Sequence, residues 1–115
     1  MSRKRRSRTA AQRRSHAPVF AALGDQTRLA LVARLANGQP HSISQLTEGF
    51  NLTRQAVTKH LRVLESAGIV HGVRTGRESL FEFDPDPIHE IREYLDLVSE
   101  QWDRAIARLK SFVED

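Results

Sequence analysis

The C-terminal third of the chain carries an apolar repeat that constrains the fold more than any other feature of the sequence. Its apolar residues are spaced alternately three and four positions apart, as in a helix that packs along another helix. A helix of about 25 residues is about 37 Å long, which is more than so small a domain covers by itself. The repeat therefore predicts a helix over about residues 87–113 and a symmetric dimer whose interface contains Ile88, Ile91, Leu95, Val98, Trp102, Ala105 and Leu109, with Phe112 continuing the repeat.

The composition limits the classes of protein to which the chain can belong. Its 115 residues predict one domain, and the absence of cysteine excludes disulfides, thiolate metal sites and cysteine nucleophiles. No apolar run approaches the roughly 20 residues of a membrane span, and no signal peptide is evident, so we expect a soluble cytoplasmic protein. No catalytic triad, phosphate-binding glycine loop or metal triad is recognisable, which predicts that the protein is not an enzyme and needs no cofactor.

The charges are segregated along the chain. Residues 1–15 carry a charge of +7 and residues 53–77 a charge of +4, whereas residues 84–115 carry −5. Two basic regions of this kind predict a polyanionic partner. We expect residues 1–15 to be disordered, as either a solubilising tail or an arm that holds phosphates, and residues 16–115 to form the folded domain.

Between these regions the sequence predicts four helices and a hairpin. The helices lie over residues 17–23, 26–37, 43–48 and 54–67, with Asp25, Ser42 and Thr53 as N-caps of the last three. In the second of them, Leu29, Val32, Ala33 and Leu35 or Ala36 fall on one side. Residues 69–76 and 78–83 read as two strands joined by a turn. The predicted fold is mainly helical with a small β-hairpin.

The helix predicted over residues 54–67 has two contrasting faces. With Val57 at the centre of its inward face, Leu61 and Leu64 lie within about 40° of that direction. The opposite face, about 100–160° away, is formed by Gln55, Thr58, Lys59 and Arg62. Glutamine, threonine and arginine can bind base edges, and Arg54 and Lys59 equally suit phosphates. We interpret this face as a DNA-reading surface; the alternative is an ordinary solvated helix surface.

Three segments within residues 19 to about 110 resemble the ArsR/SmtB family of winged helix-turn-helix repressors: LGDQTRL, TRQAVTKHLRVLESAGIV and GRESLFEFDP. The resemblance implies a homodimer on a near-palindromic, possibly autoregulatory, operator in double-stranded DNA, with the first and last helices in the dimer contact. It places Arg74 and Arg77 on the wing and, on the recognition helix, Thr53, Arg54, Gln55, Thr58, Lys59 and His60. For His60, half-buried packing and a DNA contact are both open.

The family's metal sites are not matched. One of them needs a Cys-x-Cys-like pair where this chain has SISQLTE, and another needs a histidine spacing that Asp86, His89, Glu90 and Glu93 do not provide. We therefore predict no metal ligand and a resemblance to a metal-independent branch, with an unknown inducer. Two alternatives are a dimeric winged-helix module that binds protein or RNA, and a metal-responsive repressor with a non-standard site on the last helix.

Overall fold

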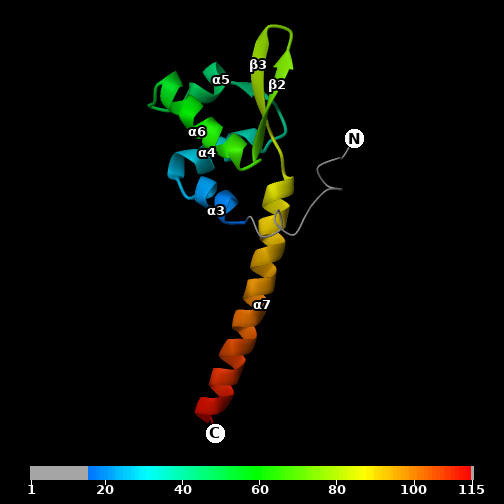
Figure 1. The fold of residues 1–115 in the computed structure, drawn as a ribbon. Coiled ribbons are helices and arrows are strands. Elements are labelled where there is room, and N and C mark those ends of the chain that lie inside the picture. Colours follow the sequence, from blue (N-terminus) through cyan, green and yellow to red (C-terminus); the bar gives the residue numbers. More distant parts are fainter. Residues whose placement is uncertain (1–15, 115) are drawn as a thin grey trace.

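The computed structural model describes residues 16–114; the predicted basic arm and Asp115 lie outside this range. Helices α3 (Ala17–Leu23), α4 (Gln26–Leu35), α5 (Ile43–Thr47) and α6 (Arg54–Ser66) precede the hairpin of strands β2 (Val70–Thr75) and β3 (Glu78–Phe83). A two-residue strand, β1 (His41–Ser42), precedes α5, and the long helix α7 (Asp86–Glu114) ends the chain. The described residues extend over 68 × 37 × 21 Å because α7 projects from the rest, away from the hairpin (Figure 1).

The core lies where α3, α4, α5, α6 and the base of the hairpin meet. Its largest fully buried side chains come from all of these elements except α3, which contributes Val19 and Ala22. They are Leu31, Leu35, Leu46, Val57, Leu61, Leu64, Ile69 and Val70. Burying such apolar surface is the main favourable contribution to folding. The core thus holds α6 by its inward face, which the sequence predicted correctly.

The predicted inward face of α4 was partly wrong. Leu31 and Leu35 are fully buried, whereas Leu29 is 51% exposed and Ala33 is also exposed. The helix carries two apolar rows, and α3, α6 and β3 all pack on the side of Leu31 and Leu35. Its periodicity alone does not tell which row faces the neighbouring elements.

The predicted N-caps are confirmed. The Asp25 carboxylate accepts a hydrogen bond from the backbone N–H of Arg28, and the Thr53 hydroxyl accepts one from that of Ala56. Ser42 and Gln45 form a reciprocal capping box at the start of α5. These caps satisfy backbone N–H groups that have no partner in the first turn of a helix. They therefore fix where α4, α5 and α6 begin.

The sheet has three antiparallel strands in the order β1-β3-β2. The hairpin agrees with the sequence analysis, but β1 was not predicted, because a two-residue strand is too short to show a periodicity. Its residues His41 and Ser42 pair with Phe81 and Leu80 of β3. The hairpin turns at Gly76, whose φ of 61° lies in the left-handed region that glycine adopts readily.

Among residues 16–114, the contacts that hold helix α7 to the rest of the domain lie near its beginning. Ile91 is 6% exposed and Ile88 packs against the core, while Tyr94 contacts the rings of His16 and Phe20. The remainder of the helix projects away from the domain (Figure 1). Of the first two residues of the predicted dimer seam, Ile91 is thus buried within the domain itself, whereas Ile88 is half-buried. Within residues 16–114, no helix is long and apolar enough to cross a membrane.

Candidate nucleic-acid interface

The polar face of α6 is open to solvent. Val57, Leu61 and Leu64 are fully buried on one side of the helix. The exposed predicted site residues of this region are Thr53, Arg54, Gln55, Lys59 and Arg62. Because the buried face holds the helix to the core, these side chains are presented on a rigid support. The structure therefore brings most of the predicted reading residues onto one exposed surface.

Thr58 lies at the edge of this surface and is half-buried. Its hydroxyl donates a hydrogen bond of 2.7 Å to the backbone carbonyl of Arg54, one helical turn earlier. The hydroxyl proton is therefore engaged within the helix. What Thr58 can offer to a DNA base is its methyl group and the remaining acceptor capacity of its oxygen.

His60 points toward α4 from the flank of α6, and its side chain is 24% exposed. Its Nδ1 lies 3.1 Å from Nη1 of Arg28 and 3.8 Å from Oδ2 of Asp25. The backbone N–H of Arg28 donates to the Asp25 carboxylate, and this bond is the main reason why the pKa of Asp25 is lowered from its ordinary value. His60 thus belongs to a polar cluster that joins α6 to the start of α4.

Arg34 holds the turn of the helix-turn-helix. Its Nη1 donates to the carbonyl oxygens of Leu46 and Glu48, at 3.0 and 2.6 Å. Its guanidinium also lies 5.4 Å from the centre of the Phe50 ring, within the range of a cation–π interaction. Arg34 therefore fixes the end of α5 and the segment that leads into α6.

The wing, formed by β2, β3 and the turn between them, carries two further cations beyond those of α6. Arg74 lies near the end of β2, opposite Ser79 of β3, and Arg77 follows Gly76 in the turn. Both arginines are exposed. The wing can therefore bring positive charge to a phosphate backbone that passes beside α6.

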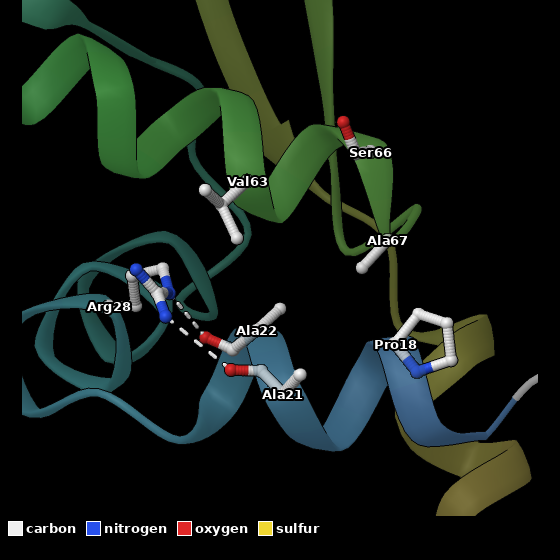
Figure 2. A pocket seen from close by; sticks show the side chains of 7 residues that line it. All are labelled: Pro18, Ala21, Ala22, Arg28, Val63, Ser66 and Ala67. Atoms are coloured by element: carbon white, nitrogen blue, oxygen red, sulfur yellow. Dashed lines mark hydrogen bonds between the residues drawn. The ribbon is translucent and has the colours of Figure 1, made fainter.

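A shallow pocket lies between α3 and α6 (Figure 2). The guanidinium of Arg28 stands at its edge and donates to the carbonyl oxygens of Ala22 and Ala21, at 2.6 and 3.4 Å. Most of the wall is apolar: the lining residues are Pro18, Ala21, Ala22, Arg28, Val63, Ser66 and Ala67. Because Arg28 also contacts His60, the pocket borders the cluster that joins α4 to α6.

The projecting part of α7 exposes the remainder of the apolar repeat. Trp102 is 65% exposed and Phe112 is 80% exposed, while Val98 and Ala105 are half-buried. The other large apolar residues on this part of the helix are Leu95, Leu97, Ile106, Leu109 and Val113, all of them exposed. An exposed apolar surface of this extent on a small domain is typical of an interaction site.

The sequence offers four residues of the last helix as candidate metal ligands, and the structure, which describes all four, does not group them into a metal site: Asp86, His89, Glu90 and Glu93. Across residues 16–114, no three histidine, aspartate or glutamate residues are grouped as metal ligands would be. His89 and Glu93 are both exposed on α7. Asp86 lies at the start of that helix, where its backbone N–H donates to Asp84.

The sequence did not indicate the contacts of two candidate functional residues, Arg28 and Arg34. Arg28 contacts His60, which is 32 positions away, and Arg34 contacts carbonyl groups 12 and 14 positions away. An arginine on a helix gives no sign of such distant partners. The one available signal for Arg28 was its place in the segment LGDQTRL.

An exposed polar helix, preceded by a short helix and a turn and followed by a two-stranded wing, defines the winged helix-turn-helix class of DNA-binding domain. In agreement, residues 23–73 match the model of a helix-turn-helix domain family. The HTH-type transcriptional regulator Rv2034 of Mycobacterium tuberculosis is 33% identical over 101 residues, which cover 88% of this chain and 91% of that protein. The chain belongs to the ArsR/SmtB family of transcriptional regulators.

Two further relatives agree with this assignment. The structure of an ArsR-like transcriptional regulator from Rhodococcus sp. RHA1 is similar with a TM-score of 0.74 and 34% identity, over 84% of this chain and 91% of that one. The HTH-type transcriptional repressor SmtB of M. tuberculosis is 35% identical over 60 residues, or 52% of this chain and 44% of that protein. The first of these likenesses includes most of the chain, and the second about half of it.

Proposed function

We propose that the protein is a homodimeric transcriptional repressor that binds a near-palindromic operator in double-stranded DNA, including one at its own gene. The observation that carries this proposal is the exposed face of α6, where Gln55, Lys59 and Arg62 lie opposite a fully buried apolar face. The wing cations Arg74 and Arg77 extend the same positive surface. The name of the SmtB relative supports repression, and a cytoplasmic location follows from the proposed DNA target.

The dimer is proposed from the exposed part of α7. Leu95, Trp102 and Leu109 are 49, 65 and 63% exposed although they continue an apolar repeat. A second copy would remove this surface from water, and the symmetric pair would present two reading helices. In such a dimer the two copies of α6 would lie about one DNA turn apart, roughly 34 Å. We therefore expect the two half-sites of the near-palindromic operator to be about one DNA turn apart.

The DNA-binding proposal is tested on the promoter region upstream of the protein's own gene. Footprinting should show protection of a near-palindromic site, and affinity for it should exceed affinity for a random duplex of equal length. RNA of matched length serves as the second competitor. Equal affinity for the promoter, random DNA and RNA would contradict the proposal and favour a general polyanion-binding module.

The dimer is tested by placing a charge on the seam. Leu95→Asp or Trp102→Asp should convert the protein to a monomer by light scattering, because each would bury an unpaired carboxylate in the interface. Ala107→Asp provides the matched control, since Ala107 is exposed on the same helix but lies outside the apolar repeat. A dimer that survives both seam substitutions would move the interface to another surface.

A further inference from the structure

Arg28 links two elements that are not neighbours in the sequence. On one side its Nε donates to the carbonyl oxygen of Ala22 at 2.6 Å, and its Nη2 lies 3.4 Å from that of Ala21. These carbonyls belong to the last turn of α3, where no N–H group four residues later lies within the helix to donate to them. On the other side, Nη1 lies 3.1 Å from Nδ1 of His60, in the middle of the reading helix α6. A single guanidinium thus bridges α3 and α6.

The chemistry of the two groups fixes the direction of this hydrogen bond. A guanidinium has only donors, so Nδ1 of His60 must be the acceptor. In a neutral imidazole the proton then resides on Nε2. Among residues 16–114, the Asp25 carboxylate also faces the ring, but its Oδ2 lies 3.8 Å from Nδ1, beyond hydrogen-bonding distance. Arg28 therefore determines both the tautomer and the orientation of the ring.

We propose that Arg28 is a positioning residue for DNA reading, which acts through His60 to fix α6 relative to α3. His60 lies between Lys59 and Arg62 along the helix that the proposed function assigns to the major groove, so this inference rests on that function. Its Nδ1 contact with Arg28 adds a polar restraint on α6 to the one that the buried Val57, Leu61 and Leu64 already provide. A small rotation of α6 would displace the side chains that reach the bases.

The same bridge connects the reading helix to the helix of the proposed dimer. His16, the N-cap of α3, and Phe20, in the middle of that helix, contact the ring of Tyr94 on α7, with ring centres 4.8 and 6.2 Å apart. Arg28 binds the other end of α3 and continues to His60. The reading helix is thereby positioned against the element that contacts α7, in addition to its own core contacts.

Two substitutions of His60 separate positioning from direct DNA contact. In His60→Asn, the amide oxygen occupies the place of Nδ1, because both atoms are bonded to Cγ. It can therefore still accept a hydrogen bond from Arg28. In His60→Gln, the amide instead reaches the place of Nε2 and leaves Arg28 without its acceptor. We expect the asparagine variant to keep the ratio of operator affinity to random-duplex affinity, and the glutamine variant to lower that ratio about tenfold.

A third variant tests Arg28 itself. Arg28→Lys keeps the positive charge but cannot bridge the α3 carbonyls and the imidazole together. It should lower the same affinity ratio about tenfold, and combining it with His60→Gln should add little, because both remove one bridge. Thermal melting establishes that each variant is folded, and ring ¹⁵N shifts in the wild-type protein should report a proton on Nε2.

The outcomes distinguish this inference from the proposed function. If the wild-type protein prefers no DNA sequence, the proposed function fails, and this inference fails with it. If the wild-type protein prefers the operator but His60→Gln binds like wild type while His60→Asn loses affinity, His60 contacts DNA directly and the positioning role is wrong. Independent, additive losses from Arg28→Lys and His60→Gln would likewise contradict a shared bridge.

Discussion

Gln55 and Thr58 lie on the same surface of α6 but have different hydrogen-bonding groups to offer. Gln55 is exposed, and its amide can present a donor and an acceptor to an adenine. Replacing Gln55 by alanine should weaken operator binding by about 1–3 kcal/mol and leave binding to random DNA nearly unchanged. The measurement is a pair of titrations at one salt concentration. Equal losses on both duplexes would show that Gln55 does not read a base.

Thr58 should act mainly through its methyl group, because its hydroxyl proton is bonded to the carbonyl of Arg54. Thr58→Val keeps a methyl group at that place, whereas Thr58→Ser keeps the hydroxyl and loses the methyl. We expect the serine variant to lose more operator affinity than the valine variant in the same titrations. The reverse order would indicate that the oxygen of Thr58 accepts a hydrogen bond from the DNA.

Asp25 should make the stability of the domain depend on acid pH. Its pKa is lowered in the folded state, first of all by the N–H of Arg28, so the charged form is favoured by folding. The stabilisation is complete above the unfolded-state pKa, about 3.9 for aspartate, and is lost as the pH falls through the folded-state value. Below about pH 4, the melting temperature of the wild-type protein should therefore fall more steeply with decreasing pH than that of Asp25→Asn. Parallel pH profiles would contradict this assignment.

The residues predicted correctly from the sequence are those whose partners are local. Asp25, Ser42 and Thr53 cap helices through bonds to residues three positions later, so their roles follow from a short segment. The contacts of Arg28 and His60 depend on how α4 and α6 pack, which no local pattern contains. The two roles left open for His60 could not be decided without that packing.

At the scale of the element, the wing should contribute affinity without sequence preference. Arg77 is exposed in its turn and suits a phosphate better than a base edge. Arg77→Ala should weaken binding to operator and random DNA alike and reduce the slope of log affinity against log salt by about 0.9. Arg77→Lys keeps the charge and should restore the slope. An unchanged slope in Arg77→Ala would mean that the wing arginine does not contact the backbone.

Elements with a sustained periodicity were predicted well, and those with an ambiguous or short pattern were not. The hairpin and the long last helix appear where the sequence placed them, and α6 buries the face centred on Val57. For α4, two apolar rows compete, and the neighbouring elements select Leu31 and Leu35. Strand β1 forms because β3 offers it an edge, not because two residues favour a strand.

At the scale of the whole molecule, the charges on α7 favour an antiparallel pair. Residues 86–103 carry six acidic residues and one arginine, a charge of −5, whereas residues 104–114 carry three basic residues and one acid, a charge of +2. A parallel pair would place like charges beside each other along the whole helix. An antiparallel pair would bring the acidic half of one copy near the basic end of the other.

This orientation is measurable because the chain has no cysteine, so an introduced cysteine is unique. Spin labels at Asp103→Cys, near the middle of the exposed seam, should lie close together in the dimer. In an antiparallel pair, labels at Ser111→Cys, eight residues further on, should be offset from each other by about 24 Å more along the helix axes than those at position 103, and should therefore be clearly farther apart. Light scattering must first show that both variants are dimers. Equal distances at the two positions would indicate a parallel pair.

The junction between the wing and α7 has a mechanical consequence. The backbone N–H of Asp84 donates to the carbonyl oxygen of Ile69, just before β2. The Asp84 carboxylate accepts from the backbone N–H of Asp86 and lies 2.6 Å from Nε2 of His71. These contacts join the ends of the two strands to the start of α7. In an antiparallel dimer whose two α7 helices cross near residue 103, about 26 Å of helix separates the crossing point from each domain, so tilting one α7 by about 10° would move its domain by more than 4 Å. In such a dimer, the distance between the two copies of α6 would therefore depend on the angle at which the two α7 helices cross.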